Sequence, residues 1–577
     1  MQSFKLLKPY FSRRRKLIAA GICCLMAVDV LQLFIPRVIK WAVDDLTARS
    51  IDWAGLATYA GEILLIAGFM AVLRFTWRRL LIGTSRVVEE GLRNRLFAHI
   101  QTLSAAYFDR AKTGDLMAHA TNDINNIRMA VGMGMVAFTD AVFLGFAAIG
   151  FMAYINIKLT LFALIPMPII IFMTRKLGQK MHQRYTSVQQ SFSALTETAR
   201  ESFSGIRIVK AYTMEDTEYR RLKENSADYI RENLRLVRIT GGFFPMMLLF
   251  TNISLTIVIF LGGRQTISGV ITAGDFVAFI NYLNLLTWPM MAMGWVTNLI
   301  QRGAASLDRI ERILQTRPEI PDPPDAVLIS RANGDLRFES VSFTYPGHAG
   351  YALSDLSFQV APGRILGIVG PQGSGKTTLL KLIPRLYDVS SGRITMDGTD
   401  IRRIRLEDLR RQIGFVSQEP FLFSGTIREN VAFGKTADDN AIMQALEAAC
   451  LAETVAAFPD GMETPVGEKG VTLSGGQKQR IVLARALIQD PPVLLLDDPV
   501  GQVDARTAAA ITETISALSG RCSIIIASHR ISAISFADQI MVLDQGRCTA
   551  SGTHGQLLAQ SPYYARTDML QRLENQD

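Results

Sequence analysis

Six long apolar segments in the first half of the chain restrict what it can fold into. Each is close to the length of about 20 residues that a helix needs to cross the hydrocarbon core of a bilayer. The segments span residues 17–37, 55–82, 128–154, 158–175, 241–262 and 274–299. Apolar residues make up 49% of the 577-residue chain and charged residues only 20%, which is typical of a protein with one part in lipid. The sequence therefore predicts an α-helical transmembrane domain of six helices over residues 1–316.

The spacing of these segments predicts how the domain is oriented. Short links alternate with two long charged segments, 83–127 and 176–240, whose composition favours helix. Lys and Arg concentrate in these long segments and near the N-terminus, so the positive-inside rule places both in the cytoplasm. We therefore expect long intracellular helical loops. The net charge of +9 is explained by this distribution, and no nucleic-acid partner is expected.

The character of the chain changes after residue 316. Residues 317–335 are rich in proline and polar side chains and read as a linker. From 336 to 577 no segment is long enough to span a membrane, and short apolar strands alternate with amphipathic helical patterns. This alternation predicts an α/β domain with a largely parallel sheet. The five cysteines have no metal-ligand spacing and are expected to be buried thiols, and no cleavable signal peptide is evident.

A glycine-rich loop lies between a predicted strand, 365–369, and a predicted helix. Residues 370–377 read GPQGSGKT and match the phosphate-binding pattern G-x-x-x-x-G-K-[ST] in the context that it requires. Backbone N–H groups and the helix N-terminus can then surround phosphate. Lys376 is expected to bridge the β- and γ-phosphates of ATP, and the Thr377 hydroxyl to hold Mg²⁺. The predicted nucleotide-binding residues here are Gly370, Gln372, Gly373, Ser374, Gly375, Lys376, Thr377 and Thr378.

Two aspartates follow a second apolar run. Residues 493–496 are wholly apolar, which predicts a strand buried on both faces of a sheet. Asp497 at its end is placed to hold Mg²⁺ through water, and Asp498 could orient the water that attacks the nucleotide. Together with the phosphate-binding loop, this pair indicates a P-loop ATPase domain that uses ATP and Mg²⁺.

Residues 473–477 read LSGGQ, and with this signature the chain resembles the ATP-binding cassette (ABC) transporters over essentially its whole length. The resemblance implies that two cassettes enclose two ATP molecules, each between the P-loop of one chain and the signature of the other. It implies that Tyr345 stacks on adenine, that Gln418 senses Mg²⁺ and that His529 contacts the γ-phosphate. The further ATP-contacting residues that it implies are Ser474, Gly475, Gly476, Gln477 and Asp504.

The first half resembles ABC exporters with six helices per chain. The similar segments are residues 107–123 and 201–212. In such exporters short coupling helices at the loop tips dock on the cassettes, and we place them at Thr113–Asp115 and Met214–Thr217. The resemblance implies a partner chain. Because no eukaryotic targeting signal is visible, we expect a bacterial inner membrane. The distribution of Lys and Arg predicts that the N-terminus and the cassette lie in the cytoplasm.

The chain departs from the family pattern next to the predicted Mg²⁺ ligand. The family usually has Glu where this chain has Asp498, and its usual Ser-Ala-Leu-Asp loop is here Gly501-Gln502-Val503-Asp504. A carboxylate that is shorter by one methylene reaches less far, and a misplacement of about 1 Å can cost roughly a hundredfold in rate. We therefore hypothesise a heterodimer in which this chain supplies the P-loop of a degenerate site and an intact signature to the competent one. The rival is a homodimer in which Asp498 works at both sites.

The sequence leaves the substrate open. Asp29 in the first segment and Asp140 in the third are ionisable residues within membrane spans, where such residues often have a function, although they could also pair within the helix bundle. The leading expectation is export of hydrophobic or amphipathic compounds, with lipid flipping second. A nucleotide-gated regulatory membrane protein is the alternative from another class.

Overall fold

The computed structural model describes residues 3–348, 350–467 and 470–574, and these form two compact units. The helical unit comprises the chain up to residue 101 together with 113–316. The sheet unit comprises the chain from residue 317 onward and a short excursion, 102–112, that comes from within the first half of the sequence. Each unit has hydrophobic clusters of its own.

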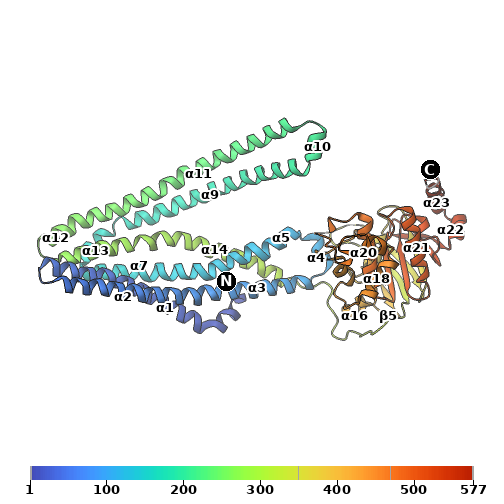
Figure 1. Cartoon of the computed structure of the whole chain (residues 1–577), viewed down its shortest axis with the longest axis horizontal. Helices are drawn as coiled ribbons and strands as arrows, with labels where there is room; N and C mark the ends of the chain where they lie inside the picture. The colour runs from blue at the N-terminus through green and yellow to red at the C-terminus, as the bar shows by residue number, and fades with distance from the viewer. Residues whose placement is uncertain (1–2, 349, 468–469, 575–577) are drawn as a thin grey trace. The chain divides into compact units, whose positions relative to one another are not determined.

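The helical unit consists of long helices joined by tight turns (Figure 1). Its helices are α1 (Lys8–Thr47), α2 (Trp53–Trp77), α3 (Gly83–Thr102), α5 (Thr113–Ala118), α6 (Ile124–Met129), α7 (Met135–Ile155), α8 (Ile157–Ala163), α9 (Met167–Ser204), α10 (Ile206–Ala211), α11 (Glu215–Ile257), α12 (Gly263–Ile267), α13 (Ala273–Leu285) and α14 (Thr287–Gln315). Single π-helical turns continue several of them, namely η2 (Arg78–Ile82), η3 (His119–Asp123), η4 (Ala130–Gly134) and η5 (Val258–Gly262), and the 3₁₀ turn η1 (Ser3–Leu6) precedes α1.

Five described helices are long and apolar enough to cross a membrane. They run over Lys8–Thr47, Trp53–Thr102, Thr113–Ile155, Leu248–Ile267 and Ala273–Gln315. The fourth predicted span, 158–175, is not one helix, because the turn 164–166 separates α8 from α9. Pro166 and Pro168 explain the break, since each lacks an amide hydrogen and its ring clashes with the carbonyl group four residues earlier. Pro289 has a similar place after the break between α13 and α14 at Leu286.

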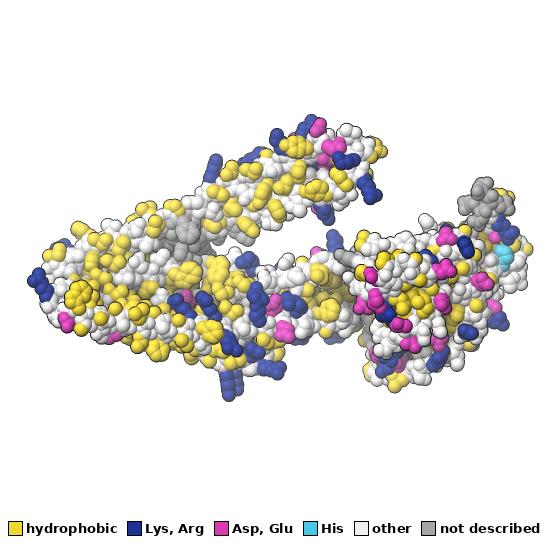
Figure 2. Space-filling view, in the orientation of Figure 1, with side chains coloured by type: hydrophobic (Ala, Val, Ile, Leu, Met, Phe, Trp, Pro, Cys, Tyr) yellow, Lys and Arg dark blue, Asp and Glu magenta, His cyan; other side chains and the backbone are white. Residues whose placement is uncertain are grey.

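The surface of the helical unit suits two environments. Large apolar side chains such as Phe146, which is 75% exposed, cover the membrane-length helices, and Figure 2 shows hydrophobic side chains gathered there. Lys and Arg lie along the extensions of α9 and α11, which run side by side and are joined at their tip by α10 (Figures 1 and 2). The unit thus combines an apolar band with long charged helical extensions.

Two sheets form the framework of the sheet unit. A six-stranded sheet has the order β10-β9-β3-β8-β7-β6, and only β10 is antiparallel to its neighbour. A smaller antiparallel sheet, absent from the sequence-based prediction, has the order β2-β1-β4-β5. The strands are β1 (Leu336–Phe343), β2 (Leu353–Val360), β3 (Ile365–Val369), β4 (Ser391–Met396), β5 (Thr399–Asp400), β6 (Ile413–Val416), β7 (Val493–Asp497), β8 (Ser523–Ala527), β9 (Gln539–Asp544) and β10 (Arg547–Gly552).

Helices cover the larger sheet, whose central strands β3, β7 and β8 are buried throughout. They are α15 (Lys376–Leu382), α16 (Leu406–Arg411), α17 (Ile427–Ala432), α18 (Asp439–Ala448), α19 (Ala452–Ala456), α20 (Gly475–Leu487), α21 (Ala505–Ala517), α22 (His554–Gln560) and α23 (Pro562–Glu574). Because β3, β8 and β7 are parallel neighbours, the loops at their carboxyl ends meet at one edge, where α/β proteins bind ligands.

The excursion 102–112 gives the sheet unit one further helix, α4 (Ala105–Arg110). Ala106 is buried in the same hydrophobic cluster as the small sheet, and the Tyr387 hydroxyl donates a hydrogen bond to Asp109 Oδ2 at 2.7 Å. The predicted docking segment Thr113–Asp115 begins directly after this excursion, in the helical unit. The second predicted site, Met214–Thr217, falls at the turn from α10 into α11.

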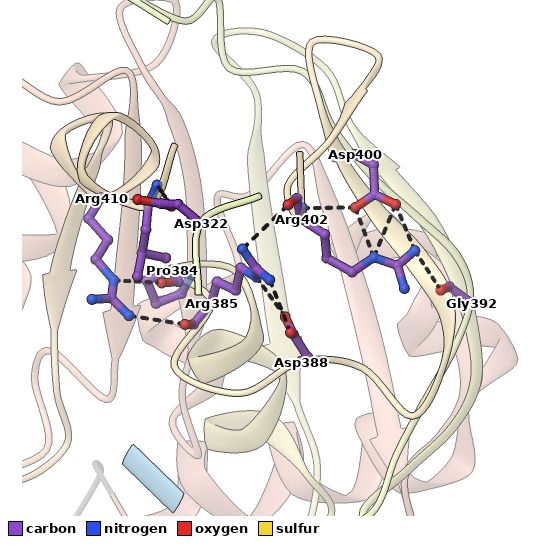
Figure 3. A network of polar contacts seen from close by, with 9 residues as sticks. Asp322, Pro384, Arg385, Asp388, Gly392, Asp400, Arg402 and Arg410 are labelled. Atoms are coloured by element: carbon purple, nitrogen blue, oxygen red, sulfur yellow. Dashed lines mark hydrogen bonds and ion pairs between the residues drawn. The ribbon is translucent and has the colours of Figure 1, made fainter. Parts of the chain in front are cut away.

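A polar network holds the loop that carries Tyr387 (Figure 3). The buried Arg385 guanidinium binds Asp388 through two hydrogen bonds of 2.7 and 3.1 Å. Arg410 donates to the carbonyl oxygen of Arg385, and Arg402 pairs with Asp400 at 2.6 Å. These contacts fix the backbone on both sides of Tyr387, so its hydroxyl is already positioned to receive the excursion.

Candidate nucleotide-binding site

The phosphate-binding loop has the backbone conformation that its glycines allow. Gly373 and Gly375 have φ values of +75° and +104°, in the region that favours glycine. A Cβ atom at Gly370 would lie 2.0 Å from the carbonyl oxygen of Leu543, so a side chain does not fit there. The loop therefore turns from β3 into α15 with its backbone exposed to a ligand at the helix N-terminus.

Lys376 closes this loop from inside. Its Nζ donates hydrogen bonds of 2.8 Å to the carbonyl oxygens of Gly370 and Pro371 and lies 3.3 Å from Ser374 Oγ. The side chain is only 7% exposed, and burial lowers the pKa of Lys376 although the charges of Asp497 and Asp498 oppose that effect. The ammonium group is thus held in a loop of carbonyl oxygens and faces the carboxylates at the end of β7.

Asp497 fits the role of a metal ligand. It is 4% exposed and accepts a hydrogen bond from the Thr377 hydroxyl, while its Oδ2 has no partner among the described residues. Burial raises the pKa of Asp497, and the hydrogen bond from Thr377 opposes the rise. Carboxylate and hydroxyl oxygens are the ligands that Mg²⁺ prefers, and a buried carboxylate oxygen without a donor is stabilised by a cation.

Asp498 lies beside Asp497 in a constrained conformation. Its φ is +52°, its N–H donates to the carbonyl oxygen of Ala527 at 2.7 Å, and its Oδ1 accepts a hydrogen bond from Ser528 Oγ at 2.9 Å. A Cβ atom on Gly501 would lie 2.3 Å from its Oδ2. The short carboxylate is therefore held back towards β8 and into the space that the glycine leaves.

His529 follows β8 and joins the same group of residues. Its half-buried ring is hydrogen-bonded to the backbone of Gly370. Burial lowers the pKa of His529, and the positive charge of Lys376 lowers it further, against the opposing effect of Asp498. The ring is consequently biased towards its neutral form in the absence of ligand.

Tyr345 stands beside the helix that follows the loop. Its hydroxyl lies 3.1 Å from Thr378 Oγ1, and its ring packs edge-on against Phe343 and Tyr387. Gln372 is exposed on the loop. The predicted residues from the P-loop, β7, β8 and Tyr345 thus gather at one edge of the sheet unit.

The signature residues form a second, separate part of the site. Ser474 caps α20 and shares a reciprocal capping box with Gln477, which leaves the amides of Gly475 and Gly476 at the helix N-terminus. In the described chain no hydrogen bond or ion pair joins these residues to the P-loop. Gln418 is exposed on the loop after β6. The signature residues thus lie apart from the hydrogen bonds of this chain's own phosphate-binding loop.

Two parts of the chain match family models, an ABC transporter transmembrane region at residues 18–290 and an ABC transporter domain at residues 353–501. The chain is 38% identical over 548 residues to the probable multidrug resistance ABC transporter ATP-binding/permease protein YheI of Bacillus subtilis (strain 168), covering 94% of this chain and 93% of that protein. It is 35% identical to the multidrug resistance-like ATP-binding protein MdlA of Escherichia coli (strain K12), covering 100% and 97%. The chain belongs to the ABC transporter family.

A solved ABC transporter has the same fold. A bacterial Atm1-family ABC exporter with ATP bound superposes with a TM-score of 0.81 at 27% identity, covering 96% of this chain and 99% of that one. This ABC transporter is accordingly a multi-pass protein of a bacterial inner membrane that couples ATP hydrolysis to transport and works as a dimer of half-transporters.

Several residues of the ABC transporter site were missed by sequence reasoning. Gln479 donates to the carbonyl oxygen of Asp498 and accepts from the N–H of Gln502 at 3.2 Å, so it links α20 to the end of β7. Gln502 Oε1 would lie 2.5 Å from a Cβ on Gly475. Gln479 lies two positions after the signature, but its position in the sequence does not predict a hydrogen bond to the residue that follows β7. Ser528 donates to Asp498 and lies directly before the predicted His529, so its position next to that residue could have marked it as part of the site.

Proposed function

We propose that this chain is one half of an ATP-driven exporter of hydrophobic or amphipathic compounds. The exporter moves these compounds across the membrane by alternating access. YheI and MdlA are named for multidrug resistance, and the similarity over nearly the whole chain supports the same substrate class for this chain. The observation that carries the proposal is the meeting of Lys376, Thr377 and Asp497 at one sheet edge in a chain that also has membrane-length helices.

Each residue of the site then has a role in using Mg-ATP. When ATP binds, the Lys376 ammonium group leaves the carbonyl oxygens of the loop and bonds to the β- and γ-phosphates. His529 contacts the γ-phosphate. Thr377, Asp497 and Gln418 would hold Mg²⁺, which would neutralise charge on the phosphates. These roles are supported by the orphaned Asp497 oxygen and by the position of Lys376 over the loop.

Two chains complete two sites between them. Tyr345 stacks on the adenine, and the partner contributes the amides of its own signature, equivalent to Ser474–Gln477, to the γ-phosphate. Asp504, which here caps α21 through Thr507, lies in the loop that crosses between the sites. Two cassettes that enclose two ATP molecules close together and reopen after hydrolysis. This cycle shifts the helical units between inward-facing and outward-facing states. The sheet unit and the long helical loops lie in the cytoplasm, as the Lys and Arg distribution supports.

We further propose that the partner is a different half-transporter. Support comes from Asp498, which is shorter than the usual Glu and is drawn towards Ser528 rather than outward. The site built on Lys376 and Asp498 then binds ATP and turns it over slowly. The intact Ser474–Gln477 serves the competent site, whose P-loop and carboxylate belong to the partner.

The first experiment is Mg-ATP hydrolysis by the purified chain alone in nanodiscs. We expect little activity from the wild type and at least roughly tenfold more from Asp498→Glu, because the longer carboxylate reaches the attacking water. Lys376→Ala in the Asp498→Glu background is the control for contaminating ATPases. Brisk hydrolysis by the wild type that Lys376→Ala abolishes would instead make the chain a self-sufficient homodimer.

Lipid flipping is the second candidate function. A curated relative, the ATP-dependent lipid A-core flippase of Syntrophus aciditrophicus (strain SB), is 34% identical over 581 residues. Inverted vesicles that contain the chain and its partner separate the readings. ATP-dependent uphill accumulation of a dye supports a pump for amphipathic compounds, movement of labelled lipid alone supports a flippase, and ATP-dependent conductance without uphill movement would leave only a nucleotide-gated regulator.

A further inference from the structure

One side chain of the C-terminal helix α23, labelled in Figure 1, contacts the loop that carries His529. Gln571 Nε2 donates a hydrogen bond to the carbonyl oxygen of His529 at 2.6 Å, and Gln571 Oε1 accepts one from the N–H of Ile531 at 2.8 Å. A Gln amide carries its donors on nitrogen and its acceptor on oxygen, so this orientation satisfies both backbone groups at once. The amide thus bridges the backbone on either side of Arg530.

The packing of α23 explains why Gln571 points at this loop. Tyr564, Asp568 and Gln571 follow one another at intervals of four and three residues, so they share one face of the helix. Tyr564 is fully buried in a hydrophobic cluster that also contains Ile531. Leu573, on the opposite face, is 51% exposed. The buried face of α23 therefore sets the position of Gln571.

The other end of the loop is fixed to the sheet through Ser528. This buried residue donates its N–H to the carbonyl oxygen of Ile368 on β3 at 3.0 Å, and its Oγ accepts a hydrogen bond from the N–H of Arg530 at 3.0 Å. The same hydroxyl donates to Asp498 Oδ1 at 2.9 Å. His529 is therefore held from one side by the strand ends and from the other side by α23.

The sheet alone does not determine where the His529 ring points. Strand β8 ends at Ala527, and His529 lies in the bend two residues beyond the last residue of the strand. A side chain that has to meet one atom of a ligand needs a backbone that is held to within about 0.5 Å. Beyond the end of β8, the two hydrogen bonds of Gln571 supply that constraint from outside the sheet.

We propose that Gln571 is a positioning residue for nucleotide binding, which holds His529 where its ring reaches the γ-phosphate and thereby makes the site prefer ATP to ADP. ADP lacks the γ-phosphate, so its affinity should not depend on where the His529 ring lies. The inference rests on the γ-phosphate contact proposed for His529, and it adds the side chain that controls this contact.

The test measures the binding of ADP and of a β,γ-imido analogue of ATP to the full chain in nanodiscs with Mg²⁺. The readout is the ratio of the two dissociation constants, because this ratio does not change when part of the protein is inactive. Gln571→Met keeps the length and the helix propensity of the side chain and removes both hydrogen bonds. We expect this variant to lower the preference for the ATP analogue at least roughly fivefold, while ADP affinity changes less than about twofold.

Two comparisons show whether Gln571 acts through His529. His529→Ala should lower the preference for the ATP analogue at least as much, and adding Gln571→Met to it should have no further effect. Gln560→Met makes the same chemical change at an exposed position of α22 and should leave the preference unchanged.

The outcomes that contradict the inference are distinguishable from failure of the proposed ATP site. If His529→Ala lowers the preference but Gln571→Met leaves it unchanged or weakens both nucleotides equally, only the positioning role of Gln571 is wrong. A further loss on adding Gln571→Met to His529→Ala would also overturn that role, because Gln571 would then act by another route. An unchanged preference in His529→Ala would overturn the γ-phosphate contact proposed for His529 and this inference with it.

Discussion

Gly501 and the carboxylate of Asp498 share one space, since a Cβ atom at position 501 would lie 2.3 Å from Asp498 Oδ2. Both residues depart from the family pattern, and the structure joins these departures in one contact. The short acid bends back towards Ser528, and the glycine beside it makes room for that conformation. Adding a side chain at position 501 while Asp498 keeps this conformation should therefore be unfavourable.

The first prediction is that Gly501→Ala destabilises the protein through Asp498. The added methyl group forces the carboxylate away from Ser528 Oγ, and such overpacking costs about 1–3 kcal/mol. Thermal unfolding of Gly501→Ala, Asp498→Ala and the double variant measures the coupling, and we expect the double variant to recover most of the loss. Gly555→Ala, at a position where a Cβ meets nothing within 4 Å, is the matched control. Additive effects would contradict the shared-space interpretation.

Asp497→Asn should separate nucleotide binding from Mg²⁺ binding. The amide keeps the size of the side chain but offers a weaker ligand to a divalent cation. Binding of a fluorescent ATP analogue should weaken at least roughly tenfold in Mg²⁺ and much less in EDTA. Equal losses in both conditions would indicate that Asp497 acts only in holding Thr377.

His529 should make the stability of the protein depend on pH. Because burial lowers the pKa of His529 below its usual 6.5, the unfolded chain binds more protons than the folded one in that range. Stability is then fully present above about pH 6.5 and falls as the pH drops towards the folded-state value. The thermal midpoint of the wild type should therefore decline more steeply below this pH than that of His529→Gln. His348→Gln, on the surface, is the control, and parallel curves for His529→Gln and wild type would contradict the prediction.

Tyr387→Phe should loosen the excursion 102–112. It removes the hydroxyl that donates to Asp109 Oδ2 at 2.7 Å, and a hydrogen bond to a charged group contributes about 1.5–3 kcal/mol. Amide hydrogen exchange over 102–112 should be roughly tenfold faster in Tyr387→Phe, in Asp109→Asn and in the double variant alike. Tyr351→Phe, an exposed tyrosine, should leave exchange unchanged.

Much of the ATP site was predictable because its parts are local in the sequence. The turn from β3 through Gly373 and Gly375 into α15 depends on glycines that are neighbours in the chain, so a short motif specifies it. The apolar run 493–496 likewise specifies a buried strand with Asp497 at its end. Parallel strands then bring these ends together by a general rule of α/β sheets.

Other features escaped sequence reasoning because they depend on packing. The turn at 164–166 interrupts a segment whose hydropathy reads as one span, since average hydropathy does not register where a proline ring clashes. The packing of residues 102–112 within the sheet unit was not predicted, because the bond from Tyr387 to Asp109 joins residues 278 positions apart.

The sequence by itself determined the division into membrane helices and a P-loop ATPase domain, because hydrophobic length and glycine spacing act locally. Only the tertiary structure decided that Gly501 accommodates Asp498 and that Tyr387 binds Asp109. Each of these contacts depends on side-chain distances of a few ångströms between packed elements. Such distances follow from how helices and strands pack together, and no pattern along the chain encodes them directly.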